Sequence, residues 1–329
     1  MLVITGGGGF IGSVVAAALN EAGRADLVIA DRFGTSDKWR NIAKRDFFEI
    51  VAIEDLFSWL DRWGESVEAV FHLGANSATT ERDADHMIAN NLNYSIAMWR
   101  WCAARGKPLI YASSAATYGD GAAGFDDAGG IAALKRLRPL NLYGWSKHAF
   151  DLWALREAAA GRAPPFWAGL KFFNVFGPNE GHKGEMMSLV AKNWRRVASG
   201  EKVRLFRSHR PDFADGEQLR DFVYVKDCAA VMLWLWRRAP AATVSGLYNC
   251  GSGQARSFLD LMRATGAACG RAPQIEFIDI PADIRAGYQY FTEANMQRLR
   301  QAGYNAPFTP LEEAVRETVA QYAAADPYL

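Results

Sequence analysis

Tyr143 and Lys147 stand four residues apart in the segment Y-G-W-S-K. Residues i and i+4 of a helix project from one face, so these side chains would be neighbours. A free phenol has a pKa of about 10 and is a poor base at neutral pH. A neighbouring ammonium stabilises the phenolate and lowers that pKa. The pair therefore predicts general acid–base chemistry on an alcohol.

A serine at the end of a predicted strand provides a partner for this pair. Leu109–Ala112 is apolar and runs directly into the segment S-S-A-A-T-Y-G. Ligands of doubly wound sheets bind beyond the carboxyl ends of the strands, so Ser114 would point into that crevice. Its hydroxyl would hydrogen-bond the same substrate oxygen as Tyr143. The expected reaction removes a proton from an alcohol while a hydride leaves its carbon for a nicotinamide.

The N-terminal segment predicts the element that would hold such a dinucleotide. An apolar strand is followed by four glycines and by a helix over Phe10–Ala22. The spacing of Gly6, Gly9 and Gly12 permits a tight turn and lets a pyrophosphate approach the backbone at the helix N-terminus. A second predicted strand ends in Asp31, roughly 20 residues after the glycines, where an acid holds a ribose hydroxyl.

The order of the predicted elements indicates an α/β protein with a Rossmann-type doubly wound parallel sheet and a smaller C-terminal substrate-binding lobe. Further strands are predicted at 69–73, 109–112 and 166–173, and helices at 56–63, 83–105 and 149–160. Later, the patterns predict strands at 220–225 and 247–250 and helices at 186–199, 227–237 and from Ser257. Thr309–Glu312 predicts a capping box that begins the last helix, with a proline at its first position. We expect the NAD(P)-binding domain at 1–170, with 221–250 returning to it, and the lobe at 171–220 and 251–329.

The bulk composition excludes several classes of protein. A chain of 329 residues, half of them hydrophobic, can bury a large core. A net charge of +1 gives no general attraction to nucleic acid or to an anionic membrane. The four cysteines form no C-x-x-C pair, and no apolar run reaches the ~20 residues of a membrane-spanning helix. Without a signal peptide before the first strand, the expectation is a soluble cytoplasmic protein with no nucleic-acid, membrane or metal partner.

Six segments carry a resemblance to known families. T-G-G-G-G-F-I-G at 5–12, S-S-A-A-T-Y-G at 113–119 and Y-G-W-S-K at 143–147 resemble the extended short-chain dehydrogenases/reductases in order and spacing. Within these, the chain resembles the ADP-heptose 6-epimerases from end to end, through F-F-N-V-F-G-P-N-E-G-H-K-G at 172–184, R-D-F-V-Y-V at 220–225 and F-T-E-A-N-M-Q-R-L-R-Q-A-G-Y at 291–304. The N-E-G-H-K-G part is the most specific, because related sugar 4-epimerases lack it.

The resemblance implies an epimerase that oxidises C6″ of ADP-D-glycero-D-manno-heptose with bound NADP, or NAD, and returns the hydride to the other face. The product, ADP-L-glycero-D-manno-heptose, is a precursor of the lipopolysaccharide core. Inversion needs acid–base groups on both faces of the carbon. The resemblance implies Tyr143 for one face, Lys183 for the other, and a homo-oligomer that is a pentamer in this family.

The positions that match the cofactor site in the family lie in the glycine segment, after the second strand and at later strand ends: Gly6, Gly9, Phe10, Ile11, Gly12, Asp31, Arg32, Lys38, Leu73, Gly74, Ala75, Asn76, Ser77, Asn90, Tyr143, Lys147 and Val175. Those that match the substrate site are Ser114, Asn174, Glu185, Lys192, Phe206, Arg207, Ser208, His209, Arg220 and Tyr288. Three positions differ from the family pattern, because Glu185 replaces a serine, Lys192 a histidine and Ile53 a lysine. Arg32 and Lys38 are suited to a 2′-phosphate, and Arg220 to a diphosphate.

Two alternative functions remain open. A nucleotide-sugar 4-epimerase or 4,6-dehydratase of the same fold would use Ser114 and Tyr143 but give Lys183 no role. A dehydratase would also need an Asp-Glu pair at the position of Ala115 and Ala116. A non-catalytic dinucleotide-binding sensor belongs to another class and would have no need of Ser114, Tyr143 and Lys147.

Overall fold

A seven-stranded sheet forms the centre of the larger part of the molecule in the computed structural model, which describes residues 1–239, 245–285 and 287–329. Every neighbouring pair of its strands is parallel, and the order is β10-β6-β5-β4-β1-β2-β3. The strands are β1 (Leu2–Thr5), β2 (Leu27–Asp31), β3 (Glu49–Ala52), β4 (Ala69–His72), β5 (Leu109–Ser114), β6 (Trp167–Phe172) and β10 (Gly246–Cys250). This order confirms the predicted Rossmann-type class.

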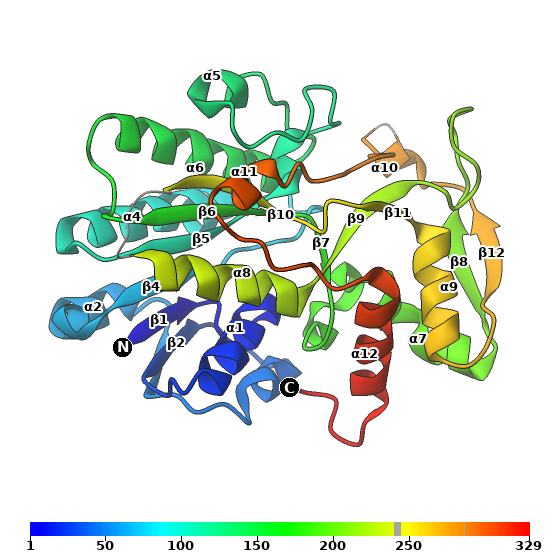
Figure 1. The fold of residues 1–329 in the computed structure, drawn as a ribbon, viewed down its shortest axis with the longest axis horizontal. Coiled ribbons are helices and arrows are strands. Elements are labelled where there is room, and N and C mark those ends of the chain that lie inside the picture. The colour runs from blue at the N-terminus through cyan, green and yellow to red at the C-terminus, as the bar shows by residue number, and fades with distance from the viewer. Residues whose placement is uncertain (240–244, 286) are drawn as a thin grey trace.

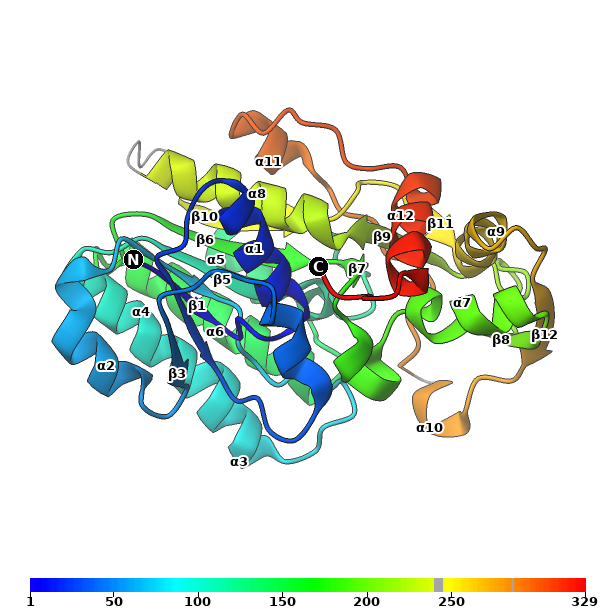
Figure 2. The same ribbon diagram turned by 90° about the horizontal axis from the view of Figure 1, so that it is seen from below.

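Helices cover both faces of this sheet, which explains why its strands read as apolar runs. In Figures 1 and 2, α1 and α8 lie on one face and α4 and α6 on the other. The helices of this part are α1 (Phe10–Glu21), α2 (Leu56–Trp63), α3 (Ala84–Met87), α4 (Tyr94–Arg105), α5 (Gly130–Leu134), α6 (Leu142–Ala159) and α8 (Val225–Arg238). Within the described residues, no helix is both long enough and apolar enough to cross a membrane.

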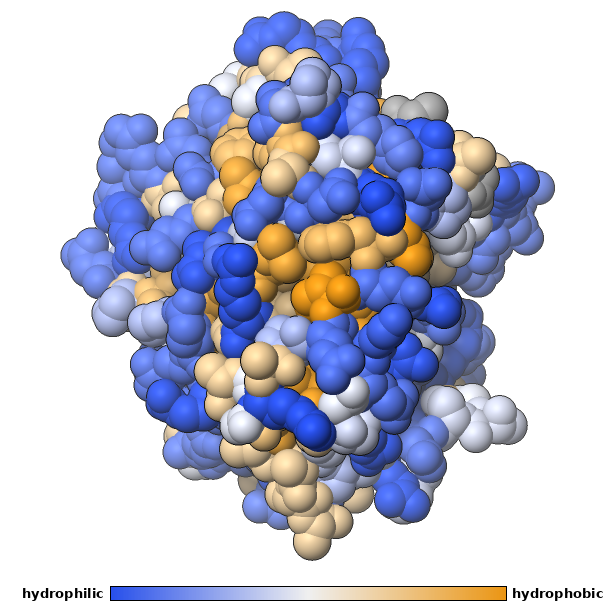
Figure 3. Space-filling model, turned by 90° about the vertical axis from the view of Figure 1, so that its right-hand side faces the viewer, coloured by the Kyte–Doolittle hydropathy of each residue, from blue (hydrophilic) through white to orange (hydrophobic). Residues whose placement is uncertain are grey.

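The smaller lobe lies at the right of Figure 1 and contains two small sheets. One has the order β11-β9-β7, from β7 (Asn174–Phe176), β9 (Leu219–Tyr224) and β11 (Ala255–Ser257), and the other pairs β8 (Lys202–Phe206) with β12 (Gln274–Ile278). The helices of the C-terminal half outside the main sheet are α7 (Leu189–Ser199), α9 (Phe258–Ala268), α10 (Ala282–Arg285), α11 (Gln297–Gln301) and α12 (Leu311–Ala323). Figure 3 views the lobe end-on, with a band of hydrophobic surface between mostly hydrophilic side chains.

The chain crosses between the two parts more than once. It leaves the main sheet after β6, forms β7, α7, β8 and β9 in the lobe, and returns through α8 and β10. β10 pairs with β6, from Gly246 opposite Ala168 to Cys250 opposite Phe172. The exact domain boundaries stay a prediction.

Several elements differ from the sequence-based expectation. Five strands were not predicted, namely β3, β7, β8, β11 and β12. Of these, β3 is an edge strand in which only Val51 is buried, so it lacks an apolar run. The helix predicted over 83–105 is interrupted by a π-helical turn at Ile88–Asn93. The helix predicted from 186 begins at Leu189, because Ser188 caps it by accepting a hydrogen bond from the Ala191 N–H at 3.2 Å.

One of two helix starts predicted from serine or threonine is confirmed. Ser257 caps α9 and forms a capping box with Asp260. The capping box predicted at Thr309 is wrong, since the Thr309 N–H and hydroxyl both donate to the carboxylate of Asp227, at 2.8 and 2.9 Å. Pro310 instead occupies the N-cap of α12. The Thr309 hydroxyl, which the sequence pattern assigned to the cap of the last helix, is used in a tertiary contact with Asp227 instead.

Candidate active site

Two cavities meet at the carboxyl ends of the central strands. The first, of about 520 Å³, runs along the glycine segment, and the second, of about 990 Å³, opens toward the lobe. Ser114, Tyr143, Phe172, Phe173 and Asn174 line both cavities. A ligand in the first cavity and a ligand in the second would therefore meet at Ser114 and Tyr143.

The glycine segment forms a cradle that side chains would fill. A Cβ atom on Gly12 would lie 2.2 Å from the carbonyl oxygen of Gly6, and one on Gly6, which has a φ of 68°, would lie 2.7 Å from the backbone of Gly74. The N–H of Gly8 donates to Asp31 Oδ2 at 2.8 Å, which fixes the loop against the end of β2. This cradle at the N-terminus of α1 fits a dinucleotide pyrophosphate.

A third cavity of about 230 Å³ adjoins the cradle and contains the two predicted cations. Lys38 Nζ lies 2.5 Å from Asp31 Oδ1, while Arg32 pairs with Glu54 and donates to Asn90 Oδ1 at 3.3 Å. All seventeen positions predicted for the cofactor line the first or the third cavity. Their binding roles stay predictions, but the fold brings all of them to one continuous region.

Helix α6 presents Tyr143 and Lys147 beside Ser114. The side chain of Asn141 caps α6 by accepting from the Gly144 N–H at 2.8 Å, so the helix begins before Tyr143 rather than at 149 as predicted. A Cβ atom on Gly144 would lie 2.7 Å from the carbonyl oxygen of Ala116. The glycine of Y-G-W-S-K thus lets α6 approach the turn that follows Ser114.

The electrostatics of the tyrosine–lysine pair correct one expectation. Burial lowers the pKa of Lys147 to about 8, with Asp151 opposing this shift, and its Nζ donates to the carbonyl oxygen of Ala112 at 2.8 Å. Burial raises the pKa of Tyr143 above its ordinary value, and a hydrogen bond with Ser114 opposes that rise. The expectation of a lowered Tyr143 pKa is therefore wrong for the chain by itself, because desolvation outweighs the hydrogen bond with Ser114 and the charge of Asp151 adds to the rise.

A fully buried ion pair anchors α6 from behind. Lys171 Nζ on β6 donates to Asp151 Oδ2 and to Thr117 Oγ1, both at 2.7 Å, and neither charged side chain is exposed. Ser113 Oγ and Tyr111 OH on β5 also donate to the Asp151 carboxylate, at 2.6 and 3.0 Å. Asp151 lies one turn after Lys147, so the pair connects the helix that carries Tyr143 to the strands on which Ser114 depends.

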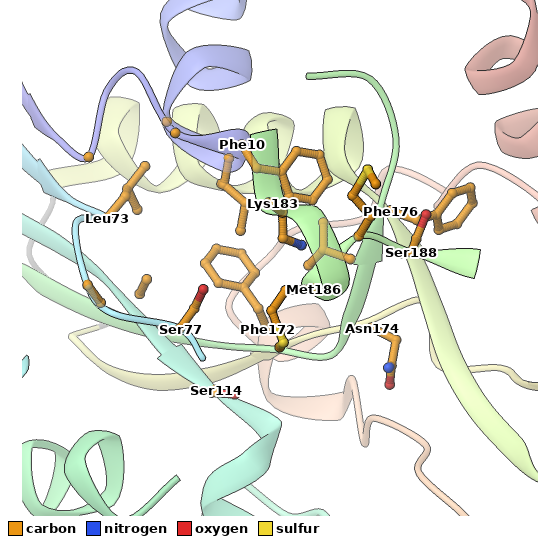
Figure 4. Close-up of a pocket in the computed structure, with 18 of the residues that line it drawn as sticks. Phe10, Leu73, Ser77, Ser114, Phe172, Asn174, Phe176, Lys183, Met186 and Ser188 are labelled. Carbon is orange, nitrogen blue, oxygen red and sulfur yellow. The ribbon is translucent and has the colours of Figure 1, made fainter. Parts of the chain in front are cut away.

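Lys183 reaches the first cavity from the segment that follows β7. It stands in a 3-10 helix over Gly181–Met186. Figure 4 shows its side chain in the middle of the pocket, with Phe10, Phe172 and Met186 around it. Its Nζ lies 4.8 Å from the centre of the Phe10 ring and 3.8 Å from Glu180 Oε2. Lys183 and Tyr143 thus line the same cavity.

The second cavity has a buried arginine in its wall. The Arg220 guanidinium lies 5.3 Å from the ring centre of Tyr288 and donates to the carbonyl oxygen of Leu219 at 2.8 Å. Burial lowers its pKa, although a guanidinium keeps its charge. Arg220 also donates to the carbonyl oxygen of Gln289, and in the described part of the chain no carboxylate pairs with it, so the protein does not neutralise its charge.

Six of the ten residues predicted for the substrate do not line any of these cavities. Glu185 is fully exposed and pairs with Lys192 at 2.9 Å. Phe206 packs against Tyr288 with ring centres 5.8 Å apart, and the backbone N–H groups of Ser208 and His209 donate to Asp215 and Tyr290. Arg207 is exposed. Only Ser114, Asn174, Arg220 and Tyr288 reach the cavity walls, and the role of the other six stays a prediction.

Some residues of the site were missed by sequence reasoning. Phe172 and Phe173 were detectable, because they end a predicted strand at the same edge as Ser114. Asn91 had no local signal. It lies in the π-helical turn, its Oδ1 accepts from the Asn76 N–H at 2.9 Å, and its Nδ2 donates to Ser146 Oγ at 3.1 Å. This amide connects the loop after β4 to α6.

Comparisons with known proteins agree with this geometry. A family model described as the NAD dependent epimerase/dehydratase family matches residues 2–251. An ADP-L-glycero-D-manno-heptose-6-epimerase of Nitratidesulfovibrio vulgaris (strain DP4) is 50% identical and is covered, like this chain, over 100% of its length. The structure of the Helicobacter pylori ADP-L-glycero-D-manno-heptose-6-epimerase is similar with a TM-score of 0.78 and 26% identity, over 98% of this chain and 96% of that one. MoeE5 in complex with UDP-glucose and NAD gives a TM-score of 0.75 and 25% identity over 97% of both chains.

Proposed function

The chain belongs to the NAD dependent epimerase/dehydratase family, and we propose that within it the chain converts ADP-D-glycero-D-manno-heptose to ADP-L-glycero-D-manno-heptose by inverting C6″. The observation that carries this proposal is the presence of Lys183 in the cavity that Ser114, Tyr143 and Lys147 also line. A 4-epimerase or a dehydratase would leave that amine without a role. The product would serve the synthesis of the lipopolysaccharide core.

The glycine cradle and the loop after β4 fit a nicotinamide dinucleotide in the first and third cavities. When bound, this cofactor would take up a hydride from C6″ and return it. Gly6, Gly9 and Gly12 would let the pyrophosphate approach the backbone at the N-terminus of α1, and Asp31 would hold a ribose hydroxyl that a 2′-phosphate leaves free. The loop over 73–77 would close the other side of the cofactor.

The side chains of the cavity would move the proton in two halves of the reaction. In the first half, Tyr143 accepts the proton of the C6″ hydroxyl as the carbon loses its hydride, and Ser114 hydrogen-bonds the oxygen. Burial raises the pKa of Tyr143, so the phenolate would depend on the Lys147 ammonium and on the positive charge that a bound oxidised nicotinamide would add. The keto sugar then turns within the site. In the second half, Lys183 donates a proton to that oxygen as C6″ regains the hydride on its opposite face. Arg220 would hold the diphosphate of the substrate.

We also propose that NADP is the preferred form of the cofactor. Arg32 and Lys38 line the third cavity, where an adenosine 2′-phosphate would lie. Removal of either cation should weaken the binding of NADP more than the binding of NAD. We expect Arg32→Ala to raise the Kd of NADP by about tenfold, consistent with the loss of one charged hydrogen bond, while the Kd of NAD changes less. Equal effects on both dinucleotides, measured by calorimetry, would assign the site to NAD.

The family resemblance supports a cytoplasmic homopentamer as a further proposal. A sedimentation velocity measurement of the purified chain tests the assembly, since a pentamer has five times the mass of the 36.3 kDa chain. A monomer or dimer at working concentrations would remove this part of the proposal. It would leave the assignment of the reaction unchanged.

The decisive experiment identifies the cofactor and the reaction in turn. Mass spectrometry of the denatured protein should find NADP, and incubation with ADP-D-glycero-D-manno-heptose should give the L-glycero epimer in the proton NMR spectrum. UDP-glucose and UDP-galactose serve as parallel substrates. Interconversion of these two UDP-sugars without change in the heptose would establish a 4-epimerase. A bound dinucleotide with no turnover of any of them would indicate the sensor.

A further inference from the structure

The segment N-E-G-H-K-G, residues 179–184, has a defined shape of which the proposed function uses only Lys183. Asn179 has a φ of 70° and is the only non-glycine residue with a positive φ in the described ranges. Gly184, at the other end, has a φ of 54°. Between them the chain makes a 3-10 turn in which the Lys183 N–H donates to the carbonyl oxygen of Glu180 at 3.0 Å. This geometry places Glu180 and Lys183 on the same side of the turn.

Glu180 is a fully buried carboxylate in this turn. Its Oε2 accepts from the Ser188 N–H at 2.7 Å, and its Oε1 accepts from the Ser188 hydroxyl at 2.6 Å and from the Gly177 N–H at 3.3 Å. These bonds stabilise the carboxylate without neutralising its charge. A glutamine at this position could keep the acceptor for Gly177 and the Ser188 hydroxyl, but not the one for the Ser188 N–H. Burying a charge is costly unless a partner compensates it. That partner is the Lys183 ammonium, with its Nζ 3.8 Å from Oε2.

We propose that Glu180 is a positioning residue that acts through Lys183, because its buried carboxylate keeps the amine protonated and aimed into the first cavity. The inference rests on the role proposed for Lys183 in the epimerase reaction. An amine that must give a proton to the sugar oxygen has to carry that proton in a site that is partly desolvated. Glu180 supplies the compensating charge from behind, where it does not obstruct the substrate.

The other groups that face Lys183 leave Glu180 as the group that favours the protonated amine. Burial lowers the pKa of Lys183, and Lys192 on α7 lowers it further, whereas Glu180 opposes both. The ring of Phe10 on α1 offers its face to the ammonium. His182, the neighbouring residue, has a pKa lowered to about 4, chiefly by burial and then by Lys38 and Lys183, and is neutral at physiological pH. Burial raises the pKa of Glu180 in turn, while Lys183 and the bonds from Ser188 and Gly177 oppose that rise, so Glu180 and Lys183 each support the charged form of the other.

Two further contacts fix this turn relative to the glycine cradle. Asn41 Nδ2 donates to the carbonyl oxygen of Gly8 at 3.0 Å and lies 3.1 Å from His182 Nδ1, which accepts from it. Asn179 Nδ2 donates to Ser13 Oγ on α1 at 3.0 Å. The amine is thus held at a set place relative to the bound dinucleotide, and Glu180 determines its direction and charge.

The test compares Glu180→Gln with the unchanged protein by labelling amines with acetic anhydride across a pH range and quantifying the Lys183 peptide by mass spectrometry. Only the neutral amine reacts, so the labelling profile reports the pKa of Lys183. We expect the midpoint to fall by about one pH unit in Glu180→Gln, which is about tenfold faster labelling at neutral pH. Glu180→Asp, which keeps the charge, should restore most of the original profile. Turnover of Glu180→Gln should fall through kcat, with the KM for ADP-heptose nearly unchanged.

Asp227→Asn is the matched control, because Asp227 also accepts a backbone N–H and a hydroxyl, both from Thr309. This variant should lower the melting temperature without shifting the Lys183 profile. An unchanged profile in Glu180→Gln would overturn the inference and leave Glu180 as a cap for α7. Labelling does not require turnover. A shifted profile in a protein that leaves ADP-heptose unchanged would therefore remove the proposed function while confirming the effect of Glu180 on Lys183.

Discussion

Tyr143 stands in the first turn of an eighteen-residue helix, whereas Lys183 stands in a short 3-10 segment, Gly181–Met186, that is kinked at Gly184. Both side chains line the first cavity. Behind Tyr143, the charges of Lys171 and Asp151 are wholly buried and are bound by three further hydroxyl groups. Behind Lys183 there is one buried carboxylate, and the lysine side chain itself keeps 22% of its exposure.

This difference shows that the same chemical task can be supported by the core or by a loop. The tyrosine side is built from strands and a helix of the main sheet, so its geometry depends on the stability of the whole domain. The lysine side depends on a few contacts of a short turn with the glycine cradle and α7. Substitutions on the tyrosine side should therefore lower both stability and turnover, and substitutions on the lysine side should lower mainly turnover.

The largest effect should come from Tyr143→Phe, which removes the hydroxyl and keeps the ring. We expect turnover of ADP-heptose to fall by about 10⁴-fold, the upper range for loss of an acid–base group. The dinucleotide should still co-purify with the variant, as measured by mass spectrometry, because the cradle is untouched. Turnover within tenfold of the unchanged protein would show that Tyr143 is not the proton acceptor on its face.

The contacts that hold the two sides of the site are compared through the unfolding free energies of Lys171→Met and Lys192→Met, measured in urea. Lys171→Met leaves Asp151 buried without its cation and should cost about 3–5 kcal/mol of unfolding free energy. Lys192→Met breaks an ion pair with the exposed Glu185 and should cost less than about 1 kcal/mol. Similar losses in the two variants would remove the contrast between a core-supported and a loop-supported side.

Lys183→Met tests the loop side directly. We expect turnover to fall by roughly 10²–10³-fold, since one of the two acid–base groups is lost, while the urea midpoint changes little because the side chain is partly exposed. Product formation is followed by NMR of the heptose. Unchanged turnover would show that Lys183 is not the acid–base group of the second face and would remove the observation on which the choice of the heptose reaction over a 4-epimerase rests.

The last comparison concerns the response of the tyrosine side to pH, through the buried Lys147. The pKa of Lys147 in the folded chain is about 8, below the ~10.4 of a free lysine, so between these values the unfolded chain binds more protons. The unfolding free energy of the unchanged protein should therefore rise with pH across this window relative to Lys147→Met, by roughly 3 kcal/mol. Below pH 8 the buried ammonium destabilises the fold, so the advantage of the variant is greatest there. Urea unfolding at pH 7 and at pH 10 measures the change, and a constant difference would contradict the lowered pKa.

The cofactor half of the site was largely predictable, because its residues lie in or next to segments with strong local signals. Gly6, Gly12 and Asp31 follow apolar strands, and parallel strands bring their carboxyl ends to one edge. Ser114 and Tyr143 were found for the same reason. The substrate half was less predictable, since Glu185 and Phe206 belong to an irregular lobe whose placement follows from no periodic pattern.

The amino-acid sequence by itself determined the class of fold, the glycine cradle and the spacing of Tyr143 and Lys147, because each depends on contacts between residues close in the chain or on a repeating pattern of burial. Only the tertiary structure decided which charges face one another. Lys171 meets Asp151, Glu180 lies behind Lys183, and Thr309 gives its hydroxyl to Asp227 rather than to its own helix. Such pairings form when distant segments exclude water together, and burial then sets the pKa of groups such as Tyr143 more strongly than their neighbours in sequence.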